Sequence, residues 1–125
     1  MPEYKEDKLD IGALLLDPNN YRFQEMKDFV SAQPDRFHEQ GVQDRAYTTL
    51  KETPTLPQLK ASILRNGFIP VERIVVTPYR NEAGKFVVIE GNRRLAALRW
   101  IADDDQAGVN ITAACRAFSG SLWLG

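Results

Sequence analysis

Apolar residues in this chain gather in four short runs, which predict the strands of a small sheet. Each run is rich in aliphatic or β-branched residues and ends at turn-forming residues, as is typical of buried strands. The runs cover Ile11–Leu16, Ile74–Thr77, Phe86–Ile89 and Ile111–Phe118. Residues 78–85 separate the second run from the third and predict a hairpin loop. Residues 1–10 are polar and charged, and they predict a frayed end.

Two longer segments place apolar residues at the spacing of an amphipathic helix. The first begins with Thr55 as its N-cap and ends at Asn66 and Gly67, which are typical of a helix C-terminus. The second follows Gly91 directly, with Asn92 as its N-cap. A strand, a tight turn and a helix are therefore expected in immediate succession around Gly91.

The rest of the chain gives weaker signals. Residues 24–30 predict a short helix. Residues 31–54 are polar, with apolar residues at irregular intervals, and predict a helical excursion that ends in a loop. The order of elements predicts an α+β fold, in which helices are packed around a small mixed sheet of about four strands.

Size and composition restrict the classes of function. A chain of 125 residues fits one domain, 1–125, with a single core. No apolar run approaches the ~20 residues of a membrane span, and the polar N-terminus lacks the apolar core of a signal peptide, so we expect a cytoplasmic protein without a membrane partner. The net charge of −1 argues against a domain that grips nucleic acid over its whole surface.

Several kinds of site are excluded by residue type. Cys115 is the single cysteine, which excludes a disulfide framework and a cysteine-rich metal site. His38 is the single histidine, which excludes histidine-cluster metal sites and most Ser-His-Asp schemes. Residues 103–105 are three consecutive aspartates, which point in different directions and predict a solvated turn rather than a cation site.

The chemistry concentrates at the turn before the last helix. Arg93 and Arg94 fall in the first helical turn, where backbone N–H groups lack partners and the helix dipole is positive. A cation there is repelled by roughly 0.3–1 kcal/mol, so two of them indicate a bound anion such as phosphate. Gly91 would let the backbone approach that anion closely. The alternative is that both arginines are solvated or bonded to Glu90 and other acidic residues.

Three blocks of this sequence resemble a known family. Residues 91–97, Gly-Asn-Arg-Arg-Leu-Ala-Ala, resemble the Gly-Glu-Arg-Arg-x-x-Ala box of the ParB N-terminal domain, in the ParB/sulfiredoxin fold superfamily. Residues 14–23 resemble the family's opening strand and Pro-Asn-Pro-x-x-x-Arg loop, and residues 59–70 resemble its Leu-x-x-Ser-Ile-x-x-x-Gly helix ending. Three blocks in the family's order argue against coincidence, and they make residues 31–54 an insertion.

The resemblance implies a ParB/sulfiredoxin-like fold and a nucleoside triphosphate, CTP or ATP, bound with Mg²⁺. ParB-like domains use the nucleotide as a switch that closes a dimer around DNA. The chain is therefore expected to be a switch module of a DNA-directed system that reaches DNA through other domains or partner proteins, and a homodimer is allowed. The residues implied to line the nucleotide site are Gly91, Asn92, Arg93, Arg94, Arg22, Ser62 and Gly67.

The chain departs from the family pattern at two places. Asn92 stands where the family has a glutamate linked to hydrolysis, and because asparagine cannot act as a carboxylate base, at most weak NTPase activity is expected. Glu90 is the candidate catalytic replacement. Residues 67–71 lack the glutamine of the family's Gly-x-x-Gln-Pro segment, which leaves open which nucleotide base the site would accept.

Two other functions remain open. Some members of this superfamily have been described as nucleases, and a metal-dependent nuclease would need convergent carboxylates, of which Glu90 alone lies beside the motif. The other alternative is a protein-interaction domain without nucleotide, in which the arginine pair is structural. No metal ligand is assigned from the sequence.

Overall fold

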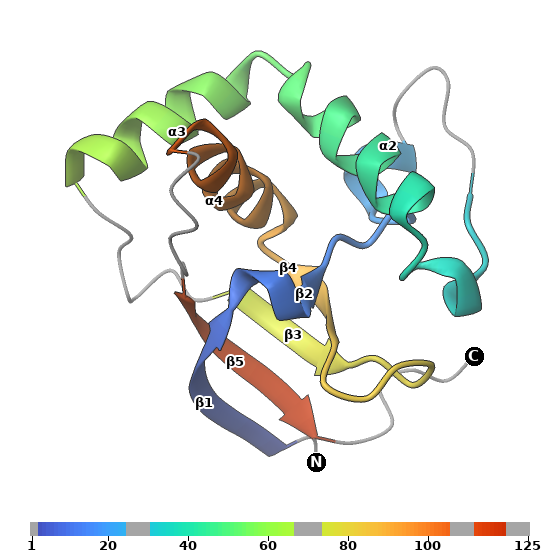
Figure 1. The fold of residues 1–125 in the computed structure, drawn as a ribbon. Helices are drawn as coiled ribbons and strands as arrows, with labels where there is room; N and C mark the ends of the chain where they lie inside the picture. Colours follow the sequence, from blue (N-terminus) through green and yellow to red (C-terminus); the bar gives the residue numbers. More distant parts are fainter. Residues whose placement is uncertain (1–2, 25–30, 67–73, 106–111, 120–125) are drawn as a thin grey trace.

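A mixed sheet forms one layer of the structure and helices form the other (Figure 1). The computed structural model describes residues 3–24, 31–66, 74–105 and 112–119. The sheet has five strands in the order β1-β5-β3-β4-β2. They are β1 (Glu3–Asp10), β2 (Leu14–Leu15), β3 (Ile74–Pro78), β4 (Phe86–Glu90) and β5 (Thr112–Ser119). The pairs β1·β5 and β3·β4 are antiparallel, whereas β3·β5 and β2·β4 are parallel.

The α+β class and the mixed sheet are confirmed, but the expected number of about four strands is wrong. Residues 3–10 form β1, which pairs along its whole length with β5, so the prediction of a frayed end does not hold for them. The first apolar run is a strand only at Leu14–Leu15. Ile11–Ala13 forms a 3-10 turn instead, since the Asp10 carboxylate accepts the N–H of Gly12 at 2.9 Å and caps it.

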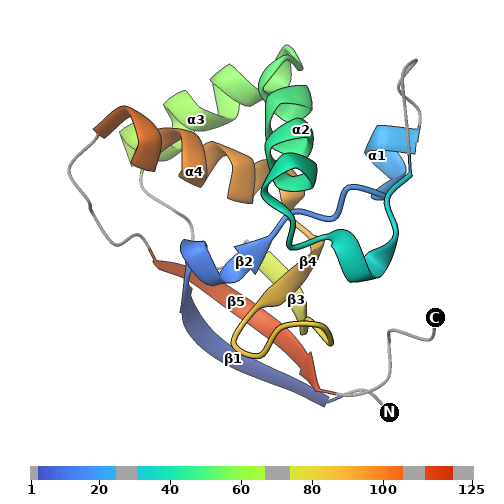
Figure 2. The ribbon, with the colours of Figure 1, turned by 45° about the vertical axis from the view of Figure 1, so that its right-hand side comes forward.

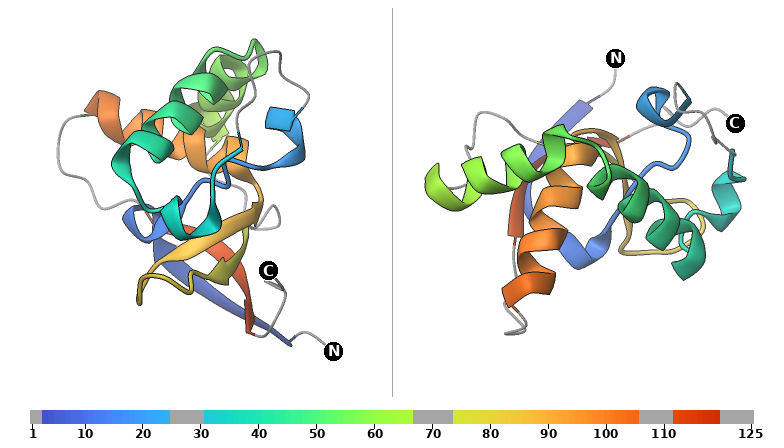
Figure 3. Two further views of the ribbon diagram at one scale, coloured as in Figure 1. Left: turned by 90° about the vertical axis from the view of Figure 1, so that its right-hand side faces the viewer. Right: turned by 90° about the horizontal axis from the view of Figure 1, so that it is seen from above.

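Helices α2, α3 and α4 lie together on one side of the sheet, rather than around it (Figures 2 and 3). The helices are α1 (Tyr21–Gln24), α2 (Gln40–Lys51), α3 (Thr55–Asn66) and α4 (Asn92–Asp105). Of the helix predicted at residues 24–30, only residue 24 lies among the described residues, and it ends α1. None of the described helices is long and apolar enough to cross a membrane.

Helix α4 is the central helix, because it contacts α2, α3 and the sheet. The main core joins its Leu95, Ala96 and Leu98 to Ile74, Val76 and Val88 of β3 and β4. Val87 alternates with Val88, so it faces the opposite side of the sheet. It packs there in a second small cluster with Leu15, Phe37 and Tyr79.

The segment 31–54 contributes directly to the core. Its helix α2 buries Ala46, Tyr47 and Leu50. Buried Gln43 donates to the carbonyl of Leu16 at 2.9 Å and accepts the Leu16 N–H at 2.8 Å. The side chain of Gln43 therefore pairs with the backbone just after β2 as a neighbouring strand would.

The three consecutive aspartates lie in the last turn of α4 rather than in a turn after it, although Asp103 and Asp104 are exposed to solvent as predicted. Asp103 accepts a hydrogen bond from the Tyr47 hydroxyl at 2.9 Å. Asp104 forms an ion pair with Lys60 of α3. These contacts join the C-terminal end of α4 to both neighbouring helices and offset the unfavourable position of carboxylates at the negative end of a helix.

Thr77→Val is expected to stabilise the fold. Thr77 is 1% exposed, and its hydroxyl has no hydrogen-bond partner among the residues that the structure describes. A buried unpaired hydroxyl costs about 1–3 kcal/mol, and valine has nearly the same shape without that cost. Urea unfolding should show a free energy of unfolding higher by about 1 kcal/mol. Thr49→Val is the control, because the exposed Thr49 hydroxyl donates to the Arg45 carbonyl. Equal stability of the two variants would contradict the prediction.

Candidate functional site

The turn between β4 and α4 borders a hollow of about 450 Å³. This hollow, called here the α4 hollow, is lined by Asn20, Leu59, Ile89, Glu90, Gly91, Asn92, Arg93 and Arg94. Four of the predicted site residues, 91–94, therefore lie together beside an open space. The predicted catalytic candidate Glu90, exposed at the end of β4, borders the same space.

Gly91 forms the turn, and the backbone conformation and the packing at this position explain why it is a glycine. Its φ is +106°, a conformation that side-chain-bearing residues rarely adopt. A Cβ at this position would also lie 3.2 Å from a side-chain carbon of Ile74 in β3. The Gly91 carbonyl accepts the N–H of Leu95 at 2.9 Å, so Gly91 is the N-cap and the prediction that Asn92 is the cap is wrong. Close packing on the sheet explains this glycine without a ligand.

Asn92 is the first residue of α4 and is only 4% exposed. Its side-chain oxygen accepts the N–H of Asp17 at 2.8 Å, and its nitrogen donates to the Val88 carbonyl at 3.4 Å. Both polar atoms of this side chain are thus engaged inside the fold. Asn92 joins the loop after β2 to the start of α4. Its side chain therefore positions the neighbouring residues of the hollow.

Arg93 and Arg94 are partly buried at the positive end of α4. The Nη1 atom of Arg93 donates to the Thr55 hydroxyl at the start of α3, at 2.9 Å. This bond uses one of the five N–H donors of the guanidinium. The first turn of α4 contains no acidic residue, although both arginines have interaction partners within the fold. The hollow therefore combines two guanidinium groups with the positive end of a helix dipole.

The other predicted site residues are Arg22, Ser62 and Gly67. Arg22 lies in α1, two positions after the hollow-lining Asn20. Ser62 lies on α3 one turn after Leu59, but it is not among the lining residues. Gly67 lies outside the described residues.

Sequence reasoning missed three lining residues: Asn20, Leu59 and Ile89. Asn20 had a signal, because it lies in the turn before the predicted ligand residue Arg22. Leu59 and Ile89 resembled ordinary core positions of an amphipathic helix and a strand, so their sequence carried no sign of the hollow.

A hydrogen-bonded loop holds Asn20 in place. The Asp17 carboxylate accepts the N–H of Asn19 at 2.9 Å, and the Asp17 carbonyl accepts the N–H of Asn20 at 3.1 Å. Burial raises the pKa of Asp17 above its usual value, and the bond from the Asn19 N–H opposes this only in part. The loop is therefore set by polar contacts, with a carboxyl group in a partly desolvated position.

The described residues contain no group of three or more histidine, cysteine, aspartate or glutamate side chains that could hold a metal ion. In the α4 hollow the one acidic lining residue is Glu90. The arrangement can bind an anion through the two arginines, and it offers a single carboxylate for contact with a cation that accompanies the anion.

Gly91→Ala is expected to destabilise the fold by about 2 kcal/mol, because alanine at a positive φ costs roughly 1–2 kcal/mol and its Cβ would press on Ile74. Gly41→Ala is the matched control, since Gly41 lies in α2 with nothing within 4 Å of an added Cβ. That variant should gain up to about 1 kcal/mol. Chemical denaturation measures both, and a Gly91→Ala protein as stable as wild type would exclude this account of the turn.

Asp17→Asn is expected to stabilise the protein at pH 7. Since the folded-state pKa of Asp17 is raised, folding favours its protonated form, and stability is lost as the pH rises through that pKa. Asparagine keeps an oxygen that can accept the Asn19 N–H but carries no charge to desolvate. Urea unfolding between pH 4 and pH 8 should show a gain that shrinks toward pH 4. Glu52→Gln, at an exposed carboxyl, controls for net charge. A gain that is constant with pH would contradict the prediction.

The comparison with known proteins gives no assignment. Tested against protein-family models, curated proteins and solved structures, the chain has no significant match. The case for a function therefore depends on the geometry of the α4 hollow and on the sequence around it.

Proposed function

We propose that the α4 hollow binds the phosphate groups of a nucleoside triphosphate, together with Mg²⁺. One observation carries the proposal: Arg93 and Arg94 both line a hollow of about 450 Å³ at the N-terminus of α4. That volume falls within the ~300–1,000 Å³ typical of small-molecule sites. Neighbouring guanidinium groups are the side chains that best match phosphate oxygens.

Electrostatics supports an anionic ligand. The α4 dipole repels each arginine by roughly 0.3–1 kcal/mol, and a bound phosphate would offset this repulsion because it attracts both the dipole and the guanidinium groups. Phosphate can also accept hydrogen bonds from the first N–H groups of a helix. The first turn of α4 contains no acidic side chain that could accept these hydrogen bonds in place of a phosphate.

The three blocks that resemble the ParB N-terminal domain converge on this hollow. Asn20 comes from the block at residues 14–23, Leu59 from the block at 59–70, and Gly91–Arg94 from the block at 91–97. A shared border on one hollow is what the resemblance predicts for these three blocks. This convergence supports a ParB-like nucleotide switch of a DNA-directed system, with DNA contacted by other domains or partner proteins.

The same geometry favours binding over turnover. Asn92 is engaged with Asp17 and Val88, so it is not available to activate water. Glu90 is the carboxylate that could contact Mg²⁺ or a water molecule. A metal-dependent nuclease would need further carboxylates, and the described residues supply no such cluster.

Nucleotide binding is expected to raise the melting temperature of the protein. CTP, ATP, GTP and UTP, each with Mg²⁺, should be compared at millimolar concentration. A ligand present at 100 times its Kd stabilises by about 2.7 kcal/mol. Arg93→Gln and Arg94→Gln should each weaken binding at least tenfold, while Arg45→Gln, an exposed arginine on α2, should bind normally. The shift on adding nucleotide is the readout, because Arg93→Gln also loses its bond to Thr55.

If no nucleotide shifts the transition, or if the double variant Arg93→Gln/Arg94→Gln keeps the shift, the proposal fails and the arginine pair is structural. Assays of phosphate release and plasmid nicking complete the test. Metal-dependent nicking that is lost in Glu90→Gln would favour the nuclease instead.

A further inference from the structure

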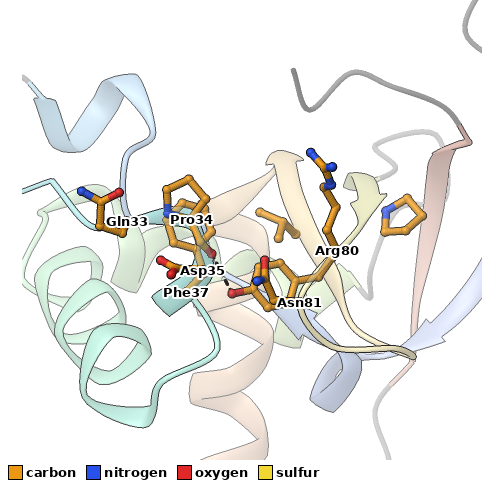
Figure 4. Close-up of a pocket in the computed structure, with 9 residues that line it drawn as sticks. Gln33, Pro34, Asp35, Phe37, Arg80 and Asn81 are labelled. Atoms are coloured by element: carbon orange, nitrogen blue, oxygen red, sulfur yellow. Dashed lines mark hydrogen bonds between the residues drawn. The ribbon is translucent and has the colours of Figure 1, made fainter. Parts of the chain in front are cut away.

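A second hollow, of about 510 Å³, lies between residues 33–37 and the turn that follows β3 (Figure 4). It shares no lining residue with the α4 hollow. Its floor is apolar, formed chiefly by Phe37, Tyr79 and Val87, with Pro34 and Pro78 beside them. Its rim is polar and consists of Gln33, Asp35, Arg80 and Asn81. An apolar floor with a few polar groups above it is typical of a small-molecule site.

The floor is held in a fixed shape. The rings of Phe37 and Tyr79 stack with centroids 6.4 Å apart and planes 7° apart. The Tyr79 hydroxyl donates to the Pro34 carbonyl at 2.6 Å and lies 3.0 Å from Nδ1 of His38. Its backbone N–H donates to the Lys85 carbonyl at 2.8 Å. Because both walls are tied to Tyr79, a ligand would meet a preformed hollow and lose little affinity to reorganisation.

The two walls carry opposite charges. Gln33 and Asp35 lie on one wall, whereas Arg80 and Asn81 lie on the other (Figure 4). All four rim side chains are exposed to solvent, so a ligand can reach them. The Arg80 guanidinium has five donors and can contact a carboxylate while it keeps other interactions. A ligand that complements both walls has a cation at one end and a carboxylate at the other.

We infer that this second hollow binds a short zwitterionic peptide with an apolar side chain. The ammonium end would lie at Asp35 and the carboxylate at Arg80, with the apolar side chain on the floor. The carboxamides of Gln33 and Asn81 can both donate to and accept from the peptide group between the charged ends. A purely anionic ligand would meet the like charge of Asp35, which a ligand with an ammonium end would not.

Isothermal titration of the full chain with phenylalanine peptides tests the inference. L-phenylalanine, glycyl-L-phenylalanine and glycylglycyl-L-phenylalanine vary the separation of ammonium and carboxylate around one side chain. At least one of the two peptides should bind, and more tightly than free L-phenylalanine, which has no peptide group for Gln33 and Asn81 to contact. Its N-acetylated form and its C-terminal amide should each bind at least tenfold more weakly, which also separates a free peptide from an internal segment of a protein. Binding of the N-acetylated form at full strength would overturn the assignment of a free peptide.

Variants of the two charged rim residues test which end of the peptide each of them contacts. Asp35→Asn should weaken the free peptide at least tenfold but leave the affinity of the N-acetylated form unchanged. Arg80→Gln should likewise weaken the free peptide at least tenfold but leave the affinity of the C-terminal amide unchanged. Glu52→Gln removes one negative charge, as Asp35→Asn does, and Arg45→Gln removes one positive charge, as Arg80→Gln does. Both controls change exposed residues in or next to α2, and both should bind the peptide as the wild type does. No binding of any peptide at millimolar concentration, or binding that neither rim variant weakens, would overturn the inference.

Discussion

The close contact between Gly91 and Ile74 determines where the central helix begins. A positive φ turns the chain sharply out of β4, and the absence of a Cβ lets the turn lie against β3. Helix α4 therefore starts directly above the sheet and contacts α2, α3 and β3 along its length. The two arginines of its first turn are carried to the hollow by the same geometry. Packing of the core and placement of the charged groups thus depend on one backbone conformation.

A chain of polar contacts extends from this turn across the protein. Asn92 binds the backbone of Asp17, and the Asp17 carboxylate binds the backbone of Asn19. The side chain of Asn19 then pairs with the backbone of Ala32, donating at 2.7 Å and accepting at 2.8 Å. Ala32 immediately precedes Gln33, which lines the second hollow. The two hollows are therefore built on one continuous hydrogen-bonded framework, although they share no lining residue.

The sequence predicted elements whose signals are local. The hairpin of β3 and β4, the two longer helices and the cluster of residues 90–94 all follow from neighbouring positions in the chain. Strand β1 was missed because its charged residues show no apolar pattern, while its stability comes from backbone pairing with β5, about a hundred positions away. The second hollow was missed for a similar reason, since residues 33–37 and 78–81 meet only in the folded chain.

Gln43 has a consequence for assembly. Strand β2 lies at one edge of the sheet, and such edges can recruit a strand from another molecule. The carboxamide of Gln43 already occupies the N–H and the carbonyl of Leu16 at the end of that strand. An incoming segment would first have to displace a buried side chain that also donates to the Phe37 carbonyl at 2.8 Å. Gln43 therefore blocks the extension of strand pairing beyond β2 at this edge of the sheet.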